Sequence, residues 1–146
     1  AVNLQKGNIA SFEAKFPDTG TATFSLPKTY LYEPNAAILK AGLFNSVSNA
    51  YKIDKLHPNS HLYTSQEMIS FPGRIFRILH IEVADRKKLL ALIPSKKANI
   101  TTRNFPQSVQ EIRKKFSLRE GGDLYLFFTT NTDNKHVVLL CEKIMK

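Results

Sequence analysis

Cationic side chains form the densest group of residues in this sequence that could do chemistry. Arg86, Lys87 and Lys88 follow Asp85, which is placed to cap a helix. Cations in a first helical turn oppose the positive end of the helix dipole, at a cost of about 0.3–1 kcal/mol each. Because a locally costly residue choice indicates function, these three residues are predicted to bind phosphate groups. A solvated, charged helix end is the alternative interpretation.

Further basic residues surround this predicted helix. Lys96 and Lys97 lie in the loop after it, and Arg103 ends the following predicted strand. They could extend a basic surface for a nucleic-acid backbone, a contact that ignores base sequence and weakens with salt. Residues 113–115, RKK, lie near the end of the next predicted helix, where the dipole favours cations. For that group a structural role is the preferred interpretation.

The histidines offer little support for a metal site. His57 and His61 are close in the sequence, but no cysteine or paired carboxylate lies near them to complete a ligand set. Pro58 also argues against a regular helix that presents both imidazoles on one face. His80 and His136 lie in apolar segments and are expected to be satisfied sheet residues. No metal-binding residue is therefore predicted.

The sequence carries no recognisable catalytic signature. It has no glycine-rich dinucleotide motif, no phosphate-binding loop and no nucleophile elbow. Its single cysteine, Cys141, lies in VVLLCEK and is expected to be a small buried residue rather than a nucleophile. Tyr125 and Phe127 could stack on bases, but their apolar strand favours core packing. No catalytic or cofactor-binding residue is predicted.

The composition is that of a chain with a real core and an uneven positive charge. The 146 residues are 42 % apolar and carry a formal charge of +9. Residues 71–146 hold 15 basic and 7 acidic side chains, against 6 and 5 in residues 1–70. This favours an acidic partner such as nucleic acid, with surface solubility as the alternative. The lone cysteine, the lack of an apolar run near the roughly 20 residues of a membrane span and the lack of a signal peptide predict a cytoplasmic location.

The N-terminal part is predicted to contain a hairpin followed by short helices. Residues 9–16 and 21–26 alternate apolar and polar side chains, and PDTG between them has turn chemistry. A helix is expected within residues 29–44, with Pro34 in its first turn and Gly42 at its end. The remaining elements expected before residue 71 are a second helix around 46–51 and an irregular or extended connection over 56–64.

From residue 73 onward, strands and helices are predicted to alternate. Apolar residues on both faces of the first strand, with Leu79, Ile81 and Val83 on one of them, predict burial on both sides. The expected elements are strand 73–83, a helix capped by Asp85, strand 98–103, a helix opened by Asn104 and Pro106, and strands 124–130 and 136–142. This β-α-β-α-β-β order predicts a mixed sheet with parallel pairs, right-handed crossovers and an antiparallel edge.

An ordered set of short motifs runs from about residue 29 to the C-terminus. The motifs are YEPN at 32–35, AAILKAG at 36–42, LHPN at 56–59, HLYTS at 61–65, FPGR at 71–74, RNFP at 103–106 and GGD at 121–123. Together they resemble the C-terminal region of bacterial class I S-adenosylmethionine-dependent methyltransferases that carry a THUMP-like domain.

The resemblance implies an α+β chain in three parts. Residues 1–28 would be a hairpin from the tail of a methyltransferase domain, residues 29–71 a small, helical, ferredoxin-like connector, and residues 72–146 a THUMP-like domain with a mixed sheet. The chain lacks the family's cofactor-binding glycine loop, acidic ribose-binding residue and target-amine motif. It is therefore expected to be a fragment that is not an enzyme by itself, and S-adenosylmethionine is expected only for the parent protein.

The resemblance also implies a function, because true THUMP domains are associated with RNA binding in RNA-modifying enzymes. The chain is expected to be a non-catalytic accessory region that binds RNA and presents it to the absent catalytic domain. RNA and that catalytic domain are thus the expected partners. The alternative is a structural module for interdomain packing or dimerisation that binds no nucleic acid.

Overall fold

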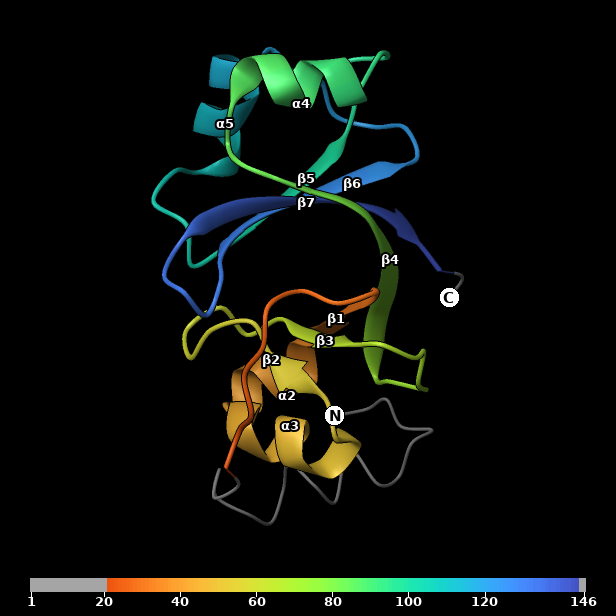
Figure 1. Ribbon diagram of the computed structural model, residues 1–146, viewed down its shortest axis with the longest axis vertical. Coiled ribbons are helices and arrows are strands. Elements are labelled where there is room, and N and C mark those ends of the chain that lie inside the picture. The colour runs from red at the N-terminus through yellow and green to blue at the C-terminus, as the bar shows by residue number, and fades with distance from the viewer. Residues whose placement is uncertain (1–20, 145–146) are drawn as a thin grey trace.

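The computed structural model describes residues 21–144, which form a seven-stranded sheet and four helices (Figure 1). The strands are β1 (Tyr30–Pro34), β2 (Asp54–Lys55), β3 (Tyr63–Ser65), β4 (Gly73–Glu82), β5 (Asn99–Arg103), β6 (Leu124–Thr130) and β7 (His136–Lys143). The helices are α2 (Ala36–Ala41), α3 (Phe44–Tyr51), α4 (Arg86–Leu92) and α5 (Val109–Phe116). None of the helices in this part of the chain is long and apolar enough to cross a membrane.

One sheet runs through both halves of the chain. Its strand order is β2-β3-β1-β4-β7-β6-β5. The first half of β4 pairs with β1, from Pro34↔Gly73 to Tyr30↔Arg77, and residues 76–82 pair with β7. The β5–β6 pair is parallel, and the other pairs between these strands are antiparallel. The mixed α+β fold predicted from the sequence is therefore confirmed, with β4 as the strand that both halves share.

The two halves of the sheet face each other between two pairs of helices. Figure 1 shows α4 and α5 outside β5, β6 and β7, and α2 and α3 outside β1, β2 and β3. Leu31, Phe76, Phe127 and Leu139 are buried in one cluster that joins the halves. Burying side chains of this size stabilises the fold by about 1.5–3 kcal/mol each. Two further apolar clusters include residues of α4 and α5 and of α2 and α3.

The α2 helix is specified by its two ends. The Asn35 side chain accepts a hydrogen bond from the Ile38 amide, and Gly42 adopts the left-handed φ of 70° that closes the last turn. The predicted helix and its end at Gly42 are confirmed. Its predicted start is wrong, because Pro34 ends strand β1. Residues 30–34 lie in the sheet between β3 and β4, and this pairing outweighs the suitability of proline for a first helical turn.

The two helices of the second half begin at side-chain caps. Asp85 caps α4 as predicted, since its carboxylate accepts a hydrogen bond from a backbone amide of the first turn. The α5 helix is capped by Ser108, which forms a reciprocal capping box with Glu111. The predicted start at Asn104 and Pro106 is wrong. Asn104 has a φ of +58°, outside the right-handed helical region, and belongs to a loop.

Burial along β4 differs from the prediction of two covered faces. The pairing with β1 stops at Arg77, so the rest of β4 has no neighbouring strand on that side among the described residues. Leu79, Ile81 and Val83 are 41 %, 50 % and 49 % exposed as a result. The sheet has an antiparallel edge at β2, which pairs with β3, whereas β7 lies in the middle of the sheet between β4 and β6.

Only part of the predicted N-terminal hairpin falls on residues that the structure describes. Residues 9–16 lie outside them. Within 21–26, Phe24 makes an isolated parallel bridge with Lys55 rather than forming the expected strand. The neighbouring strand β2 has only two residues, and two backbone hydrogen bonds to Lys55 hold the segment there.

Candidate functional site

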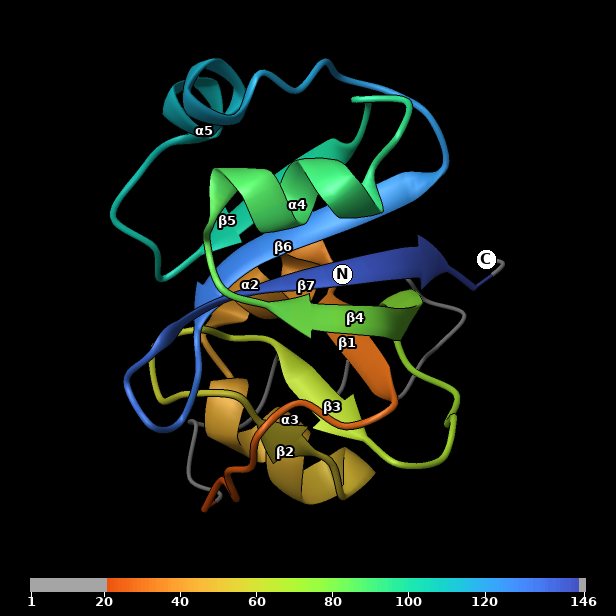
Figure 2. The same ribbon diagram turned by 45° about the horizontal axis from the view of Figure 1, so that its top comes forward.

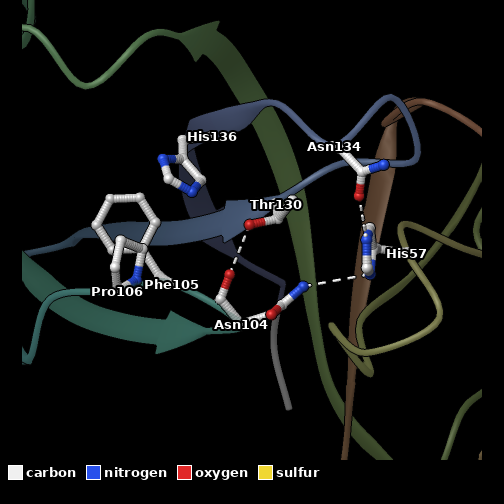
Figure 3. A pocket seen from close by; sticks show the side chains of 7 residues that line it. All are labelled: His57, Asn104, Phe105, Pro106, Thr130, Asn134 and His136. Carbon is white, nitrogen blue, oxygen red and sulfur yellow. Dashed lines mark hydrogen bonds between the residues drawn. The ribbon is translucent and has the colours of Figure 1, made fainter.

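A cavity of about 620 Å³ lies at the carboxyl ends of the parallel strands β5 and β6. It is lined by His57 from the loop after β2, Asn104, Phe105 and Pro106 from the loop after β5, Thr130 at the end of β6, Asn134 from the β6–β7 turn and His136 at the start of β7 (Figure 3). Its volume lies within the roughly 300–1,000 Å³ of small-molecule sites.

His57 fixes the orientation of the two asparagines beside it. Its Nδ1 accepts a hydrogen bond from the Asn59 amide at 3.0 Å, so the neutral ring carries its hydrogen on Nε2 and donates to Asn134 Oδ1 at 2.7 Å. The Asn104 amino group also donates to Nδ1, at 3.2 Å. Within residues 21–144, the Asn104 Oδ1 atom and the Asn134 amino group then have no protein partner.

The loop after β5 is held firmly in place. Thr130 Oγ1 donates to the Asn104 carbonyl oxygen at 2.6 Å, and Ser60 Oγ donates to the Thr130 carbonyl oxygen at 2.7 Å. The Phe105 ring packs on the core and lies 5.0 Å, between centroids, from the exposed ring of His136. The cavity therefore has hydrogen-bonded backbone on one side and an aromatic pair on another, as Figure 3 shows.

Buried Glu33 links the two halves of the molecule through two arginines. Its carboxylate oxygens accept hydrogen bonds from Arg74 Nε at 2.6 Å and from an Arg103 terminal nitrogen at 2.7 Å. The Glu33 side chain is 8 % exposed, and those of the arginines are 40 % and 30 % exposed. Arg103 was predicted from the sequence to extend a phosphate-binding surface. In the structure it forms an ion pair with the buried carboxylate of Glu33.

The first turn of α4 is exposed, as a ligand-binding role requires. Arg86, Lys87 and Lys88 are all exposed, and Arg86 donates a hydrogen bond at 2.9 Å to Oγ of Ser117, the residue that ends α5. The last turn of α5 carries two more exposed lysines, so basic groups that the sequence separates adjoin in the structure. We call this set, Arg86, Lys87, Lys88, Lys114 and Lys115, the α4–α5 basic surface.

Lys96 and Lys97 lie at the opposite end of the strands. The strand pairings make β4, β5 and β6 run in the same direction. The first turn of α4 follows the end of β4, whereas Lys96 and Lys97 precede the start of β5, beside Arg119, whose amide donates to the Lys96 carbonyl at 2.8 Å. The six predicted residues therefore occupy three places, and phosphate binding by them stays a prediction.

The other candidate groups have structural surroundings. His61 stacks on Phe44 with centroids 3.6 Å apart, and its Nδ1 lies 3.2 Å from Lys55 Nζ, whereas His57 belongs to the cavity. In the described part of the chain, no three His, Cys, Asp or Glu side chains come together as a metal site. Cys141 is fully buried, and burial raises the pKa of its thiol. The prediction that Cys141 is a buried residue is confirmed.

The cavity does not fit S-adenosylmethionine. Its lining includes no carboxylate for the ribose hydroxyls and no glycine-rich turn. We therefore assign no step of methyl transfer to these residues.

Comparison with known proteins identifies the two halves. Residues 30–72 match a family described as a ferredoxin-like domain, and residues 73–143 match a family described as THUMP domain-like. The chain therefore contains a ferredoxin-like domain followed by a THUMP-like domain. A crystal structure described as that of a "putative methyltransferase" from Porphyromonas gingivalis W83 is similar over 86 % of this chain, with 40 % sequence identity and a TM-score of 0.80. This chain spans 32 % of that protein's length, and a search of curated proteins found no match.

Sequence reasoning missed the asparagines of the cavity and misplaced one histidine. Asn104 was assigned to a helix start, and His136 was expected to be satisfied within the sheet, but it is exposed. One signal was available. The RNFP and NTDNK segments follow strands that the predicted crossover makes parallel, and this arrangement places their polar residues at one edge of the sheet. Nothing in the sequence indicated that His57 would join them.

Proposed function

We propose that this chain is a non-catalytic accessory region of a methyltransferase and that it binds RNA through the α4–α5 basic surface. The THUMP-like domain and the similarity to the Porphyromonas gingivalis protein support this proposal. The chain positions the RNA backbone, and a catalytic domain elsewhere in a longer protein transfers the methyl group from S-adenosylmethionine.

The lysines of the α4–α5 basic surface carry the proposal, because no carboxylate among the described residues neutralises them. Among the described residues, the lysines of this surface form no ion pair, whereas Arg74, Arg77 and Arg103 each pair with a glutamate. Clustered cations that the protein leaves unbalanced attract the phosphates of a nucleic acid and release its counterions. Such contacts hold the backbone in place without reading base sequence.

Single charge reversals test the proposal against a matched control. Lys88→Glu changes an exposed lysine of the α4–α5 basic surface, and Lys40→Glu changes an exposed lysine in the last turn of α2. We expect Lys88→Glu to weaken binding of an RNA hairpin about fivefold or more in fluorescence anisotropy at low salt, and Lys40→Glu to change it by less than about twofold. Equal losses in both variants, or no binding by the wild type, would contradict the proposal.

A second candidate function is packing of β4 against the catalytic domain of the same protein. Leu79, Ile81 and Val83 are large, exposed apolar residues, and β4 has an open side there among the described residues. Exposed apolar groups on such a strand favour an interface. We expect Ile81→Lys to abolish co-elution of this chain with a separately produced catalytic domain and to leave RNA binding unchanged. Co-elution that survives the substitution argues against this interface.

A further inference from the structure

The residues that line the cavity at the ends of β5 and β6 are not those expected for binding the phosphate backbone of an RNA. None of its lining residues is Lys, Arg, Asp or Glu. Its polar groups are amides, a hydroxyl and imidazoles, and the rest of its wall is aromatic or apolar. A site of this composition suits a neutral, polar, planar ligand better than a phosphate or a carboxylate.

The available groups match a ring with hydrogen-bonding edges. Asn104 presents Oδ1 as an acceptor, and both ring nitrogens of His136 have no hydrogen-bond partner among residues 21–144. The His136 ring is exposed and leans on Phe105 at an interplanar angle of 59°, which leaves an aromatic surface at the rim. Proteins recognise unpaired bases by stacking them on aromatic rings and by bonding their edges to amides.

These groups are oriented by the protein itself. The bond from the Asn104 amino group to His57 determines which end of the amide remains available, and the bond from Thr130 holds the Asn104 backbone. A ligand therefore meets an acceptor whose position is already set, which lowers the entropy lost on binding.

The cavity and the α4–α5 basic surface lie at the same end of the sheet. In the left part of Figure 2, β5 and β6 end, the β6–β7 turn lies below them, and α4 begins above. Lys135, an exposed residue of that turn, directly precedes His136 in the chain. A nucleic acid whose phosphates contact Lys135 and the α4–α5 basic surface could place one base in the cavity.

We propose that the cavity binds one unpaired nucleobase of an RNA, which stacks on His136 and donates a hydrogen bond to Asn104 Oδ1. This inference rests on the proposed RNA-binding function and specifies which feature of the RNA the chain selects. It predicts a preference for single-stranded RNA over a blunt duplex, since the bases of a duplex are paired and stacked.

Paired histidine substitutions test this inference. His136→Ala removes the stacking ring, and His80→Ala removes another exposed histidine of the same sheet, on β4. The affinities of both variants are measured for a mixed-sequence single-stranded RNA and for a blunt duplex of the same sequence. We expect His136→Ala to weaken binding of the single strand about fivefold or more and to leave duplex binding within about twofold. His80→Ala should change neither affinity.

A second variant guards against misfolding. Asn104→Gly fits the φ of +58° at this position and removes the proposed acceptor, so it should also weaken single-strand binding alone. If the wild type binds both RNAs and neither His136→Ala nor Asn104→Gly weakens single-strand binding selectively, the cavity proposal fails while the RNA-binding function stands. If the wild type binds neither RNA, the proposed function fails. If the wild type binds neither RNA but added adenosine shifts the NMR signals of the Asn104 side-chain amide, the cavity binds a free nucleoside. That result would overturn RNA as the source of the base.

Discussion

Basic side chains have different surroundings in two regions of the molecule. One region is the junction between the two halves, formed by Glu33, Arg74 and Arg103, and the other is the α4–α5 basic surface. At the junction, the buried carboxylate of Glu33 holds Arg74 and Arg103. On the α4–α5 basic surface, Lys87 and Lys88 are exposed and form no ion pair among the described residues. The density of basic residues in a sequence therefore does not locate a binding surface by itself. What separates the two regions is whether the fold supplies a carboxylate.

Removing the carboxylate at the junction should give the largest loss of stability. Glu33→Ala leaves Arg74 and Arg103 without their counter-charge, and because these arginines are 40 % and 30 % exposed, the expected cost is that of the lost charge-assisted hydrogen bonds, about 1.5–3 kcal/mol. Chemical denaturation measures the free energy of unfolding. Glu120→Ala is the control, because the Glu120 side chain is 77 % exposed and lies 3.7 Å from Arg113. Equal effects of the two substitutions would show that the junction does not depend on Glu33.

On the α4–α5 basic surface, by contrast, a charge substitution should stabilise the fold. Lys87→Glu replaces a cation near the positive end of the α4 dipole by an anion, and it should raise the free energy of unfolding by about 0.3–1 kcal/mol. The same variant should bind RNA more weakly. A substitution that stabilises the fold while it impairs binding would show that this lysine is retained for binding. A loss of both stability and binding would instead place Lys87 among the structural residues.

In the ferredoxin-like domain, the ion pair between Lys28 and Asp54 should make a smaller contribution to the free energy of unfolding, and this contribution should depend on pH. Burial acts to raise the pKa of Asp54, but hydrogen bonds from Lys28 and Thr23 and the charge of Lys28 bring the pKa below its ordinary value of 3.8. A lowered pKa gives stability that is present above pH 3.8 and is lost as the pH falls through the pKa of the folded state. Asp54→Asn should thus cost less than about 1 kcal/mol at neutral pH.

That cost should vanish on acidification. The measurement compares the free energies of unfolding of the wild type and Asp54→Asn between pH 7 and about pH 2. A difference that stays constant or grows at low pH would contradict the role of the Lys28 pair.

The sequence predicted local elements well where one signal dominated. Asp85 capped α4, Gly42 ended α2, and the β-branched and aromatic runs gave β5, β6 and β7. It failed where long-range pairing decided the outcome. Pro34 lies in a strand because it pairs with Gly73 of β4, and Leu79 is exposed because β1 ends before reaching it.

The candidate site divides in the same way. The exposed cations of α4 could be predicted, because the cost of their position is local. The pairing of Arg103 with Glu33 could not, since 70 residues separate them in the chain. The cavity was also missed. It depends on His57 meeting Asn134 and Asn104 across the junction, and those contacts exist only once β4 joins the two halves.

The salt dependence of RNA binding tests the central claim most directly. For the wild type, the logarithm of the association constant for an RNA hairpin should fall linearly with the logarithm of the salt concentration. For the variant Lys87→Glu/Lys88→Glu, the slope should be smaller by about 1.4–1.8, which corresponds to two lost phosphate contacts. Circular dichroism of both proteins would confirm that they are folded. A wild-type affinity that does not change with salt, or identical slopes for the two proteins, would contradict RNA binding by the α4–α5 basic surface.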